Sequence, residues 1–213
     1  MRQTKHNFLI IVTIILVSGI SSCTVNNDYY NTNPNNAGTG YQYLFNEDFN
    51  SDTRGWAFDD PIDSAYALVS NGMYKMVDYS FTGGYHIAAV STGANVNRNF
   101  LVQSRIKSNN AMALIFGASP NSYGYSFFID DTGYFAVYKE GTSPQTLITW
   151  TKANAIKVGW NDVEVEQIAD YWNFYINGTK VWQTPARSLG GSQMGFMVLP
   201  NTTGFADYLT LKW

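Results

Sequence analysis

Residues 160–184 constrain the fold of this chain more than any other stretch, because alternating strands and tight turns follow one another there without a break. Residues 163–166 alternate valine with glutamate, which is the period of two of a half-buried strand. A second alternating run at residues 172–176 leads into Asn177-Gly178, the dipeptide of a type I′ hairpin turn, and residues 180–184 return antiparallel. Such a meander has one apolar face, which a second layer must cover.

Short apolar and aromatic runs bounded by Gly, Asn, Asp or Pro recur through the rest of the chain, and no run of ten or more residues has helical periodicity. Asn71-Gly72 and Asp131-Thr132-Gly133 mark two more turns. Further strands are predicted at residues 44–49, 66–69, 73–77, 85–90, 100–107, 111–117, 125–129, 134–139, 146–150, 195–199 and 206–213. The pattern predicts one all-β domain over residues 43–213, a two-sheet antiparallel jelly-roll sandwich.

The N-terminal residues predict a targeting signal. Residues 8–17 form an apolar run after Arg2 and Lys5 that is shorter than the roughly 20 residues of a membrane span. Residues 20–23, Ile-Ser-Ser-Cys, resemble the lipobox of bacterial lipoproteins, in which the chain is cut before a cysteine that is then acylated. We expect a signal peptide at residues 1–22 and a lipid anchor on Cys23, which is the single cysteine of the chain.

Residues 23–42 are rich in asparagine and have no apolar periodicity, which predicts a flexible tether behind the lipidated cysteine. The expected location is the cell envelope, with the domain held on a bacterial membrane at a periplasmic or surface face.

The composition excludes several kinds of function. Only 14% of the residues are charged, so solubility rests mainly on Asn, Ser, Thr and Tyr, and such a surface suits neutral, hydroxyl-rich partners. A net charge of -3 and the absence of any Lys/Arg run argue against nucleic-acid binding. One cysteine and two histidines exclude a cysteine-based zinc cluster and a histidine-rich metal site.

A family resemblance lies in the order of six segments: EDFNSDTRGW, NGMYKM, GYSFFIDDTGYFAVYK, VGWNDVEVE, YWNFYINGTKVW and GFADYLTL. This order resembles the concanavalin A-like, laminin-G-like jelly roll, in particular the bacterial lipoprotein and secreted versions grouped with keto-disaccharide hydrolases. The resemblance covers residues 43–213. It implies the fold and leaves the function open, because this sandwich carries lectins, glycoside hydrolases and adhesion modules alike.

The catalytic candidates are weak. Glu164 and Glu166 stand two apart on one strand, so they share a face at about 6.5 Å, close to the carboxyl separation of retaining glycosidases. The Glu-x-Asp-x-x-Glu pattern of laminarinases is incomplete, however, and such pairs are common on the solvated side of a sheet. No Gly-x-Ser-x-Gly elbow is present, and His86 is the one histidine beyond the leader. Whether the protein is an enzyme stays open, and a non-catalytic role is favoured.

The aromatic residues supply the ligand-binding candidates. Many of the 15 Tyr, 13 Phe and 6 Trp must be core residues. Rings beside Gly, Ser, Asn or Asp in predicted loops can stack on sugars, and these are Trp56, Tyr79, Phe81, Tyr85 and Tyr123. His86 and Arg105 can add hydrogen bonds, the latter if its strand's polar face is the concave one. For each ring the alternative is a residue that shields the edge of the sandwich.

A calcium site is implied by the resemblance, because relatives of this sandwich often hold Ca²⁺ between the first and last strands. Glu47 and Asp207 are the matching positions. The alternative is that both carboxylates are simply solvated.

Three functions follow from these observations. The first is a lipid-anchored, non-catalytic carbohydrate-binding or adhesion module whose partner is a glycan or polysaccharide. The second is a hydrolase of glycosides or keto-disaccharides. The third is a structural component of an envelope complex with protein partners, which an exposed apolar patch would favour.

Overall fold

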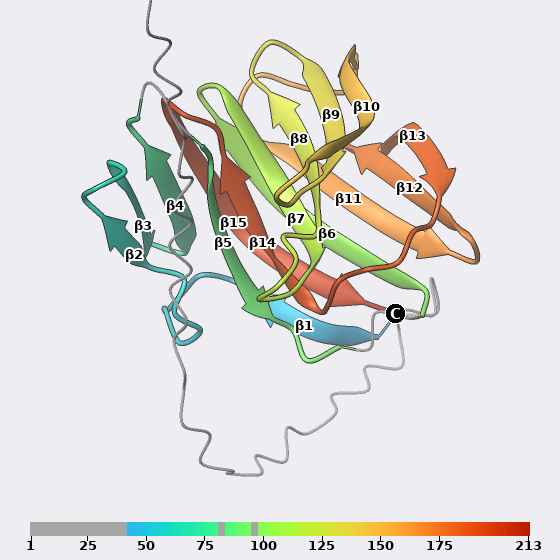
Figure 1. Ribbon diagram of the computed structural model, residues 1–213, viewed down its shortest axis with the longest axis horizontal. Coiled ribbons are helices and arrows are strands. Elements are labelled where there is room, and N and C mark those ends of the chain that lie inside the picture. The colour runs from blue at the N-terminus through green and yellow to red at the C-terminus, as the bar shows by residue number, and fades with distance from the viewer. Residues whose placement is uncertain (1–41, 81–83, 95–97) are drawn as a thin grey trace, which may run out of the picture. The chain divides into compact units, whose positions relative to one another are not determined.

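The computed structural model describes residues 42–80, 84–94 and 98–213, and in it they form two packed antiparallel β-sheets (Figure 1). The predicted all-β sandwich is confirmed. Within these residues no helix is long and apolar enough to cross a membrane. Cys23, the signal peptide, nearly all of the tether and Phe81 lie outside the described residues, so those proposals stay predictions.

The larger sheet has nine strands in the order β13-β12-β11-β6-β15-β4-β3-β2, and β1 also pairs with β15. Its strands are β1 (Tyr43–Glu47), β2 (Phe58–Asp60), β3 (Ala65–Ser70), β4 (Met73–Asp78), β6 (Phe100–Ser108), β11 (Asn161–Ile168), β12 (Tyr171–Ile176), β13 (Thr179–Pro185) and β15 (Thr202–Lys212).

The smaller sheet has six strands in the order β10-β9-β8-β7-β14-β5. They are β5 (His86–Ser91), β7 (Ala111–Ala118), β8 (Tyr125–Asp130), β9 (Tyr134–Lys139), β10 (Gln145–Lys152) and β14 (Gln193–Val198). The larger sheet extends past the smaller one on both sides in Figure 1, with β2 and β3 at one end and β12 and β13 at the other.

Asn-Gly turns connect the strands of the two hairpins that the sequence predicted. Asn177 and Gly178 have φ values of 50° and 74°, and Asn71 and Gly72 have values of 54° and 68°. A type I′ turn needs two such left-handed residues, which asparagine and glycine adopt at low cost. The β11-β12-β13 meander therefore forms as predicted and makes one end of the larger sheet.

The core between the sheets is largely aromatic. Phe196 of the smaller sheet packs on Tyr74 of the larger one with ring centroids 5.5 Å apart, and Phe116 packs on Trp172 at 5.2 Å. All four side chains are fully buried. Offset and edge-on pairs of this kind stabilise a sandwich beyond the area that they remove from water.

One strand was not predicted. β2 has the sequence Phe-Asp-Asp, which shows neither alternation nor β-branched residues, and it forms by pairing with β3 at the edge of the sheet. Tertiary pairing thus overrides a weak local preference here.

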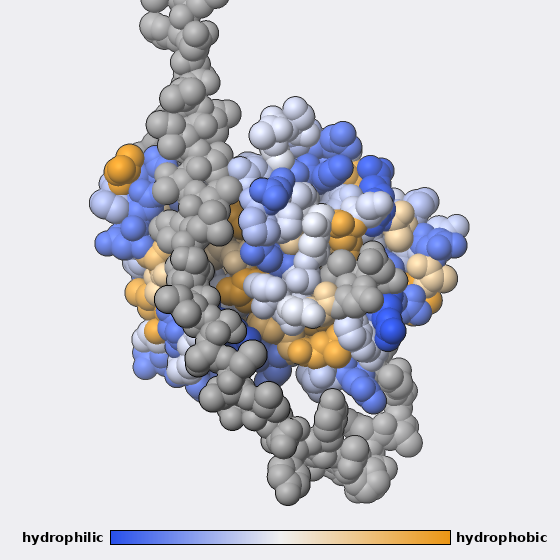
Figure 2. Space-filling view, turned by 60° about the horizontal axis from the view of Figure 1, so that its bottom comes forward, coloured by the Kyte–Doolittle hydropathy of each residue, from blue (hydrophilic) through white to orange (hydrophobic). Residues whose placement is uncertain are grey.

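The exposed large hydrophobic side chains are scattered over the surface. Figure 2 shows one side of the molecule, where hydrophobic residues appear in separate patches among hydrophilic ones. The exposed ones belong to different strands and turns: Tyr43, Ile62, Leu68, Tyr79, Tyr134, Val158, Ile168 and Tyr171. Scattered exposure of this kind is ordinary on folded proteins and indicates no single docking patch.

Candidate functional site

The outer face of the smaller sheet, which points away from the core, carries a second buried apolar layer. The residues of this layer alternate with core residues along their strands, and each is at most 3% exposed: Ala111, Ala113, Ile115, Ala118, Phe128, Ala136 and Met197. Half-buried side chains of Tyr85, Ile87, Tyr138, Trp150 and Leu199 pack against them. This face is therefore an apolar floor with aromatic rings around it.

Glu140 lies on the same face, directly after β9, where it continues the outward alternation of Ala136 and Tyr138. Its backbone N–H donates to the Gly124 carbonyl at 2.8 Å, which holds it beside the start of β8. Only 6% of the residue is exposed. Its carboxylate accepts a hydrogen bond from the hydroxyl of Ser126, which is itself fully buried.

Burial gives this cluster its electrostatic character. It raises the pKa of Glu140, while hydrogen bonds from Ser126 and Tyr85 partly offset that increase. The pKa of Tyr85 is raised to about 12 by burial and by the nearby Glu140 and Tyr123. The pKa of Tyr138 is raised by burial and by Glu140. The structure thus brings the predicted residue Tyr85 to a carboxylate that the sequence did not single out, and a second predicted residue, Tyr123, lies near Tyr85.

A nearly buried carboxylate on the solvent side of a sheet lowers the stability of the fold, because desolvation penalises its charge. Groups with perturbed pKa values are frequent at functional sites, where binding or chemistry depends on the shifted pKa. Glu140 can accept hydrogen bonds from ligand hydroxyls, and the rings of Tyr85, Tyr123 and Tyr138 can cover the ligand's apolar side.

The outer face of the larger sheet brings together the other predicted residues. Glu164 and Glu166 share this face of β11 as expected. Gln103 donates to Glu164 at 3.0 Å, and the Tyr175 hydroxyl donates to Glu166 at 3.1 Å. Arg105 has an exposed side chain and lies 3.5 Å from Asp207. These are partnered charges on a solvated sheet.

A shallow hollow of about 240 Å³ lies at one end of this second face, lined by Lys107, Ser108, Asn109, Gly159, Thr203 and Phe205. The Lys107 ammonium lies 4.6 Å from the Trp160 ring centroid and 4.9 Å from that of Phe205. The Lys107 ammonium makes cation–π contacts with the faces of both rings. Those ring faces are therefore less available for stacking on a ligand.

One prediction needs correction. Trp56 is 1% exposed, and its indole N–H donates to Glu47 at 2.9 Å, so it is a core residue and not a loop ring for sugars. Glu47 also accepts from the Phe49 N–H and pairs with Arg54 at 3.1 Å. Asp207 pairs instead with Arg105. Glu47 and Asp207 thus have separate partners, and the possible metal-ligand cluster found among the described residues includes neither. A calcium site at these two residues stays a prediction.

Tyr79 and His86 lie apart from the Glu140 cluster. The Tyr79 ring is 56% exposed and lies 6.1 Å from the Tyr66 ring on the larger sheet. His86 faces the other way from Tyr85 on β5 and bonds to Asp78 at 2.8 Å. A ligand role for either residue stays a prediction.

Comparison with known proteins identifies the architecture. No protein-family model and no curated protein sequence matches the chain. Among solved structures, the CBM2 module of the evolved Dit protein of Lactobacillus casei BL23 phage J-1 is similar, with a TM-score of 0.57 at 11% identity over 81% of this chain and 96% of that one. The fold is a jelly roll.

Two further solved structures are similar to the chain. A GlcNAcα1-4Gal-releasing endo-β-galactosidase from Clostridium perfringens has a TM-score of 0.52 at 12% identity, covering 82% of this chain and 63% of that one. A carbohydrate-binding module, CBM66 from Bacillus subtilis, has a TM-score of 0.48 at 17% identity, covering 82% and 96%. At these identities the likeness concerns the fold alone.

Proposed function

We propose that this jelly roll is a carbohydrate-binding module whose glycan lies on the outer face of the smaller sheet, against Glu140, Tyr85 and Tyr123. The observation that carries the proposal is a carboxylate only 6% exposed on the solvent side of that sheet, bordered by hydroxyl donors and half-buried rings.

Sugar chemistry matches this arrangement. The C–H faces of a pyranose or furanose stack on flat rings, while its hydroxyls donate to fixed acceptors. A hydrogen bond to an ionised carboxylate is about twice as strong as one between neutral groups. The sparse charge of the sequence also fits an uncharged ligand. The CBM2 module of the phage Dit protein, a structural neighbour, supports the same proposal.

Binding without hydrolysis fits this face better than catalysis. Glycosidases of the usual kind place two carboxyl groups about 5 to 9.5 Å apart across the scissile bond. In the described part of the chain, Glu140 is the one acidic residue on this face that is less than a tenth exposed. The competing hypothesis, a glycoside or keto-disaccharide hydrolase that uses Glu164 and Glu166, would place its chemistry on the opposite sheet.

The sequence adds a cellular address to the proposal. With an acyl chain on Cys23, the module would hold glycans at the bacterial cell envelope. Metabolic labelling with a palmitate analogue tests this: we expect label on the wild-type protein and none on Cys23→Ala. Label that persists in the variant would contradict the anchor.

The binding proposal is tested with a glycan array followed by affinity electrophoresis in gels that contain each polysaccharide that scores. We expect at least one polysaccharide to retard the wild-type protein, and Tyr123→Ala to weaken the retardation at least tenfold. Trp160→Ala, an aromatic truncation on the opposite sheet, is the matched control and should behave as wild type. The proposal is wrong if no polysaccharide retards the protein, or if Trp160→Ala loses binding and Tyr123→Ala keeps it.

A further inference from the structure

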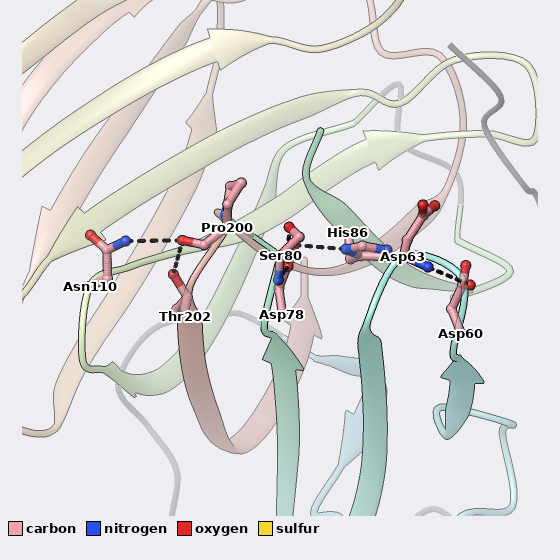
Figure 3. A network of polar contacts seen from close by, with 8 residues as sticks. All are labelled: Asp60, Asp63, Asp78, Ser80, His86, Asn110, Pro200 and Thr202. Atoms are coloured by element: carbon pink, nitrogen blue, oxygen red, sulfur yellow. Dashed lines mark hydrogen bonds and ion pairs between the residues drawn. The ribbon is translucent and has the colours of Figure 1, made fainter. Parts of the chain in front are cut away.

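One end of the sandwich gathers a histidine and two aspartates from different sheets. Asp60 ends β2, Asp63 lies in the turn before β3, and His86 begins β5. One potential ligand atom from each residue lies within 4.8 Å of the other two. Figure 3 shows the His86 ring between Asp78 and Ser80 on one side and Asp63 and Asp60 on the other.

Asp78 fixes the orientation of the imidazole. Its side chain is fully buried, and one oxygen lies 2.8 Å from the Nδ1 atom of His86. The other oxygen accepts from the Ser80 N–H at 2.8 Å and from its hydroxyl at 2.5 Å. An ionised carboxylate only accepts, so Nδ1 carries the hydrogen, and the neutral ring keeps its lone pair on Nε2.

Packing holds the same ring from a second direction. The Phe58 ring stacks on His86 with centroids 6.2 Å apart and planes 18° apart. The ring is therefore positioned by a buried hydrogen bond and by an aromatic face together. Ligating histidines in proteins usually donate their second ring N–H to a carboxylate in this way.

The charges around the ring are unbalanced. Asp60, Asp63 and Asp78 contribute three carboxylates, and in the described part of the chain neither Asp60 nor Asp63 forms a salt bridge with Lys or Arg. One Asp60 oxygen accepts from the Ile62 and Asp63 backbone N–H groups, each at 3.2 Å, and among the described residues no hydrogen bond is found to the other. A cation bound here would offset this negative charge.

We propose that Asp60, Asp63 and His86 bind a divalent transition-metal ion, with Zn²⁺ as the best-fitting member. One imidazole nitrogen and two carboxylate oxygens are ligands that suit zinc, whereas Ca²⁺ and Mg²⁺ prefer oxygen alone. Zinc bonds of about 2.0 to 2.2 Å place the ligand atoms roughly 3.5 Å apart. The three ligand atoms here lie within 4.8 Å of one another, so small side-chain movements would bring them to that spacing. Bound metal would join the β2–β3 hairpin to β5.

The test is isothermal titration of ZnCl₂ into metal-stripped full-length protein, with thermal unfolding measured in parallel. We expect one equivalent to bind and the unfolding temperature to rise as zinc exceeds its dissociation constant. Asp63→Asn and His86→Ala should each weaken zinc binding at least tenfold. Asp78→Asn, which changes only the positioning residue, should weaken it by about 10- to 100-fold.

Asp59→Asn is the matched control, because Asp59 is an exposed aspartate of the same short strand outside the cluster. It should bind zinc as wild type does. Asp63 lies in an exposed turn, so Asp63→Asn tests the site even if His86→Ala does not fold. The proposal fails if zinc shows no saturable binding, if Asp63→Asn binds zinc as tightly as Asp59→Asn, or if Ca²⁺ binds the wild type as tightly as zinc.

Discussion

The outer faces of the two sheets differ in how their charged groups are placed. On the larger sheet, Lys212 donates to Gln103 at 2.6 Å and Gln103 donates to Glu164 at 3.0 Å, so charges balance one another near water. On the smaller sheet, Glu140 is buried among tyrosines and apolar side chains. Solvated ion pairs change the free energy of unfolding little. A carboxylate removed from water lowers stability unless hydrogen bonds or an opposite charge compensate for the lost hydration.

This difference distinguishes an ordinary surface from a candidate site. Charged residues are numerous on the larger sheet, and several of them pair with neighbouring polar or charged side chains near water. Glu140 has hydroxyl neighbours, and among the described residues no salt bridge to Lys or Arg is found for it.

The largest effect is expected from truncating the outer layer of the smaller sheet. Ile115 is fully buried although it points away from the main core, so Ile115→Ala should lower the free energy of unfolding by about 2 to 4 kcal/mol. Leu68 lies on the outer face of the larger sheet and is 36% exposed. Leu68→Ala should cost less than about 1 kcal/mol. Urea denaturation measures the free energy of unfolding of both variants. Equal losses of stability in the two variants would contradict the proposed difference between the two outer faces.

A smaller effect of opposite sign is expected from Glu140→Gln. Because the pKa of Glu140 is raised in the folded protein, the folded state binds the proton more tightly than the unfolded one. The wild type therefore loses stability as pH rises from the ordinary value of 4.5 through the raised value, and the glutamine variant does not. At pH 7 the variant should be more stable by up to about 1 kcal/mol.

The measurement is the free energy of unfolding of wild type and Glu140→Gln from pH 4 to pH 8. The difference between them should grow with pH through that window and then level off. A variant that is less stable than wild type at pH 7 would make Glu140 a structural residue.

The smallest effect is expected from Glu166→Gln on the larger sheet. Glu166 is partly exposed and accepts from Tyr175, so the change should alter stability by less than about 1 kcal/mol and glycan binding by less than twofold. Reducing-sugar release from any bound glycan should also be the same in both proteins. A hydrolytic activity that Glu166→Gln abolishes would establish the competing hypothesis.

Much of the fold could be predicted because it is encoded locally. The Asn-Gly turns need left-handed residues, and the alternation around Val163 and Val165 assigns one face of β11 to the core. Trp56 was predicted wrongly because its neighbours Gly55 and Asp52 are typical of a loop, while its ring packs on Phe49, Tyr74 and Phe196 from distant segments.

The site could be predicted only in part. Tyr85 and Tyr123 were recognised as rings in polar surroundings, but Glu140 stands one residue beyond a predicted strand and has no motif around it. Its environment comes from Ser126 and Tyr85, which only the pairing of strands brings close. The outward alternation of Tyr134, Ala136 and Tyr138 leads to Glu140 and was the available signal.

The most direct test of the account is calorimetric titration of one glycan that the array identifies into three proteins: wild type, Glu140→Gln and Glu164→Gln. The two variants make the same chemical change on opposite sheets. We predict that Glu140→Gln weakens binding at least tenfold without a fall in unfolding temperature, while Glu164→Gln stays within twofold of wild type. Unchanged affinity in Glu140→Gln, or a loss confined to Glu164→Gln, would contradict the account.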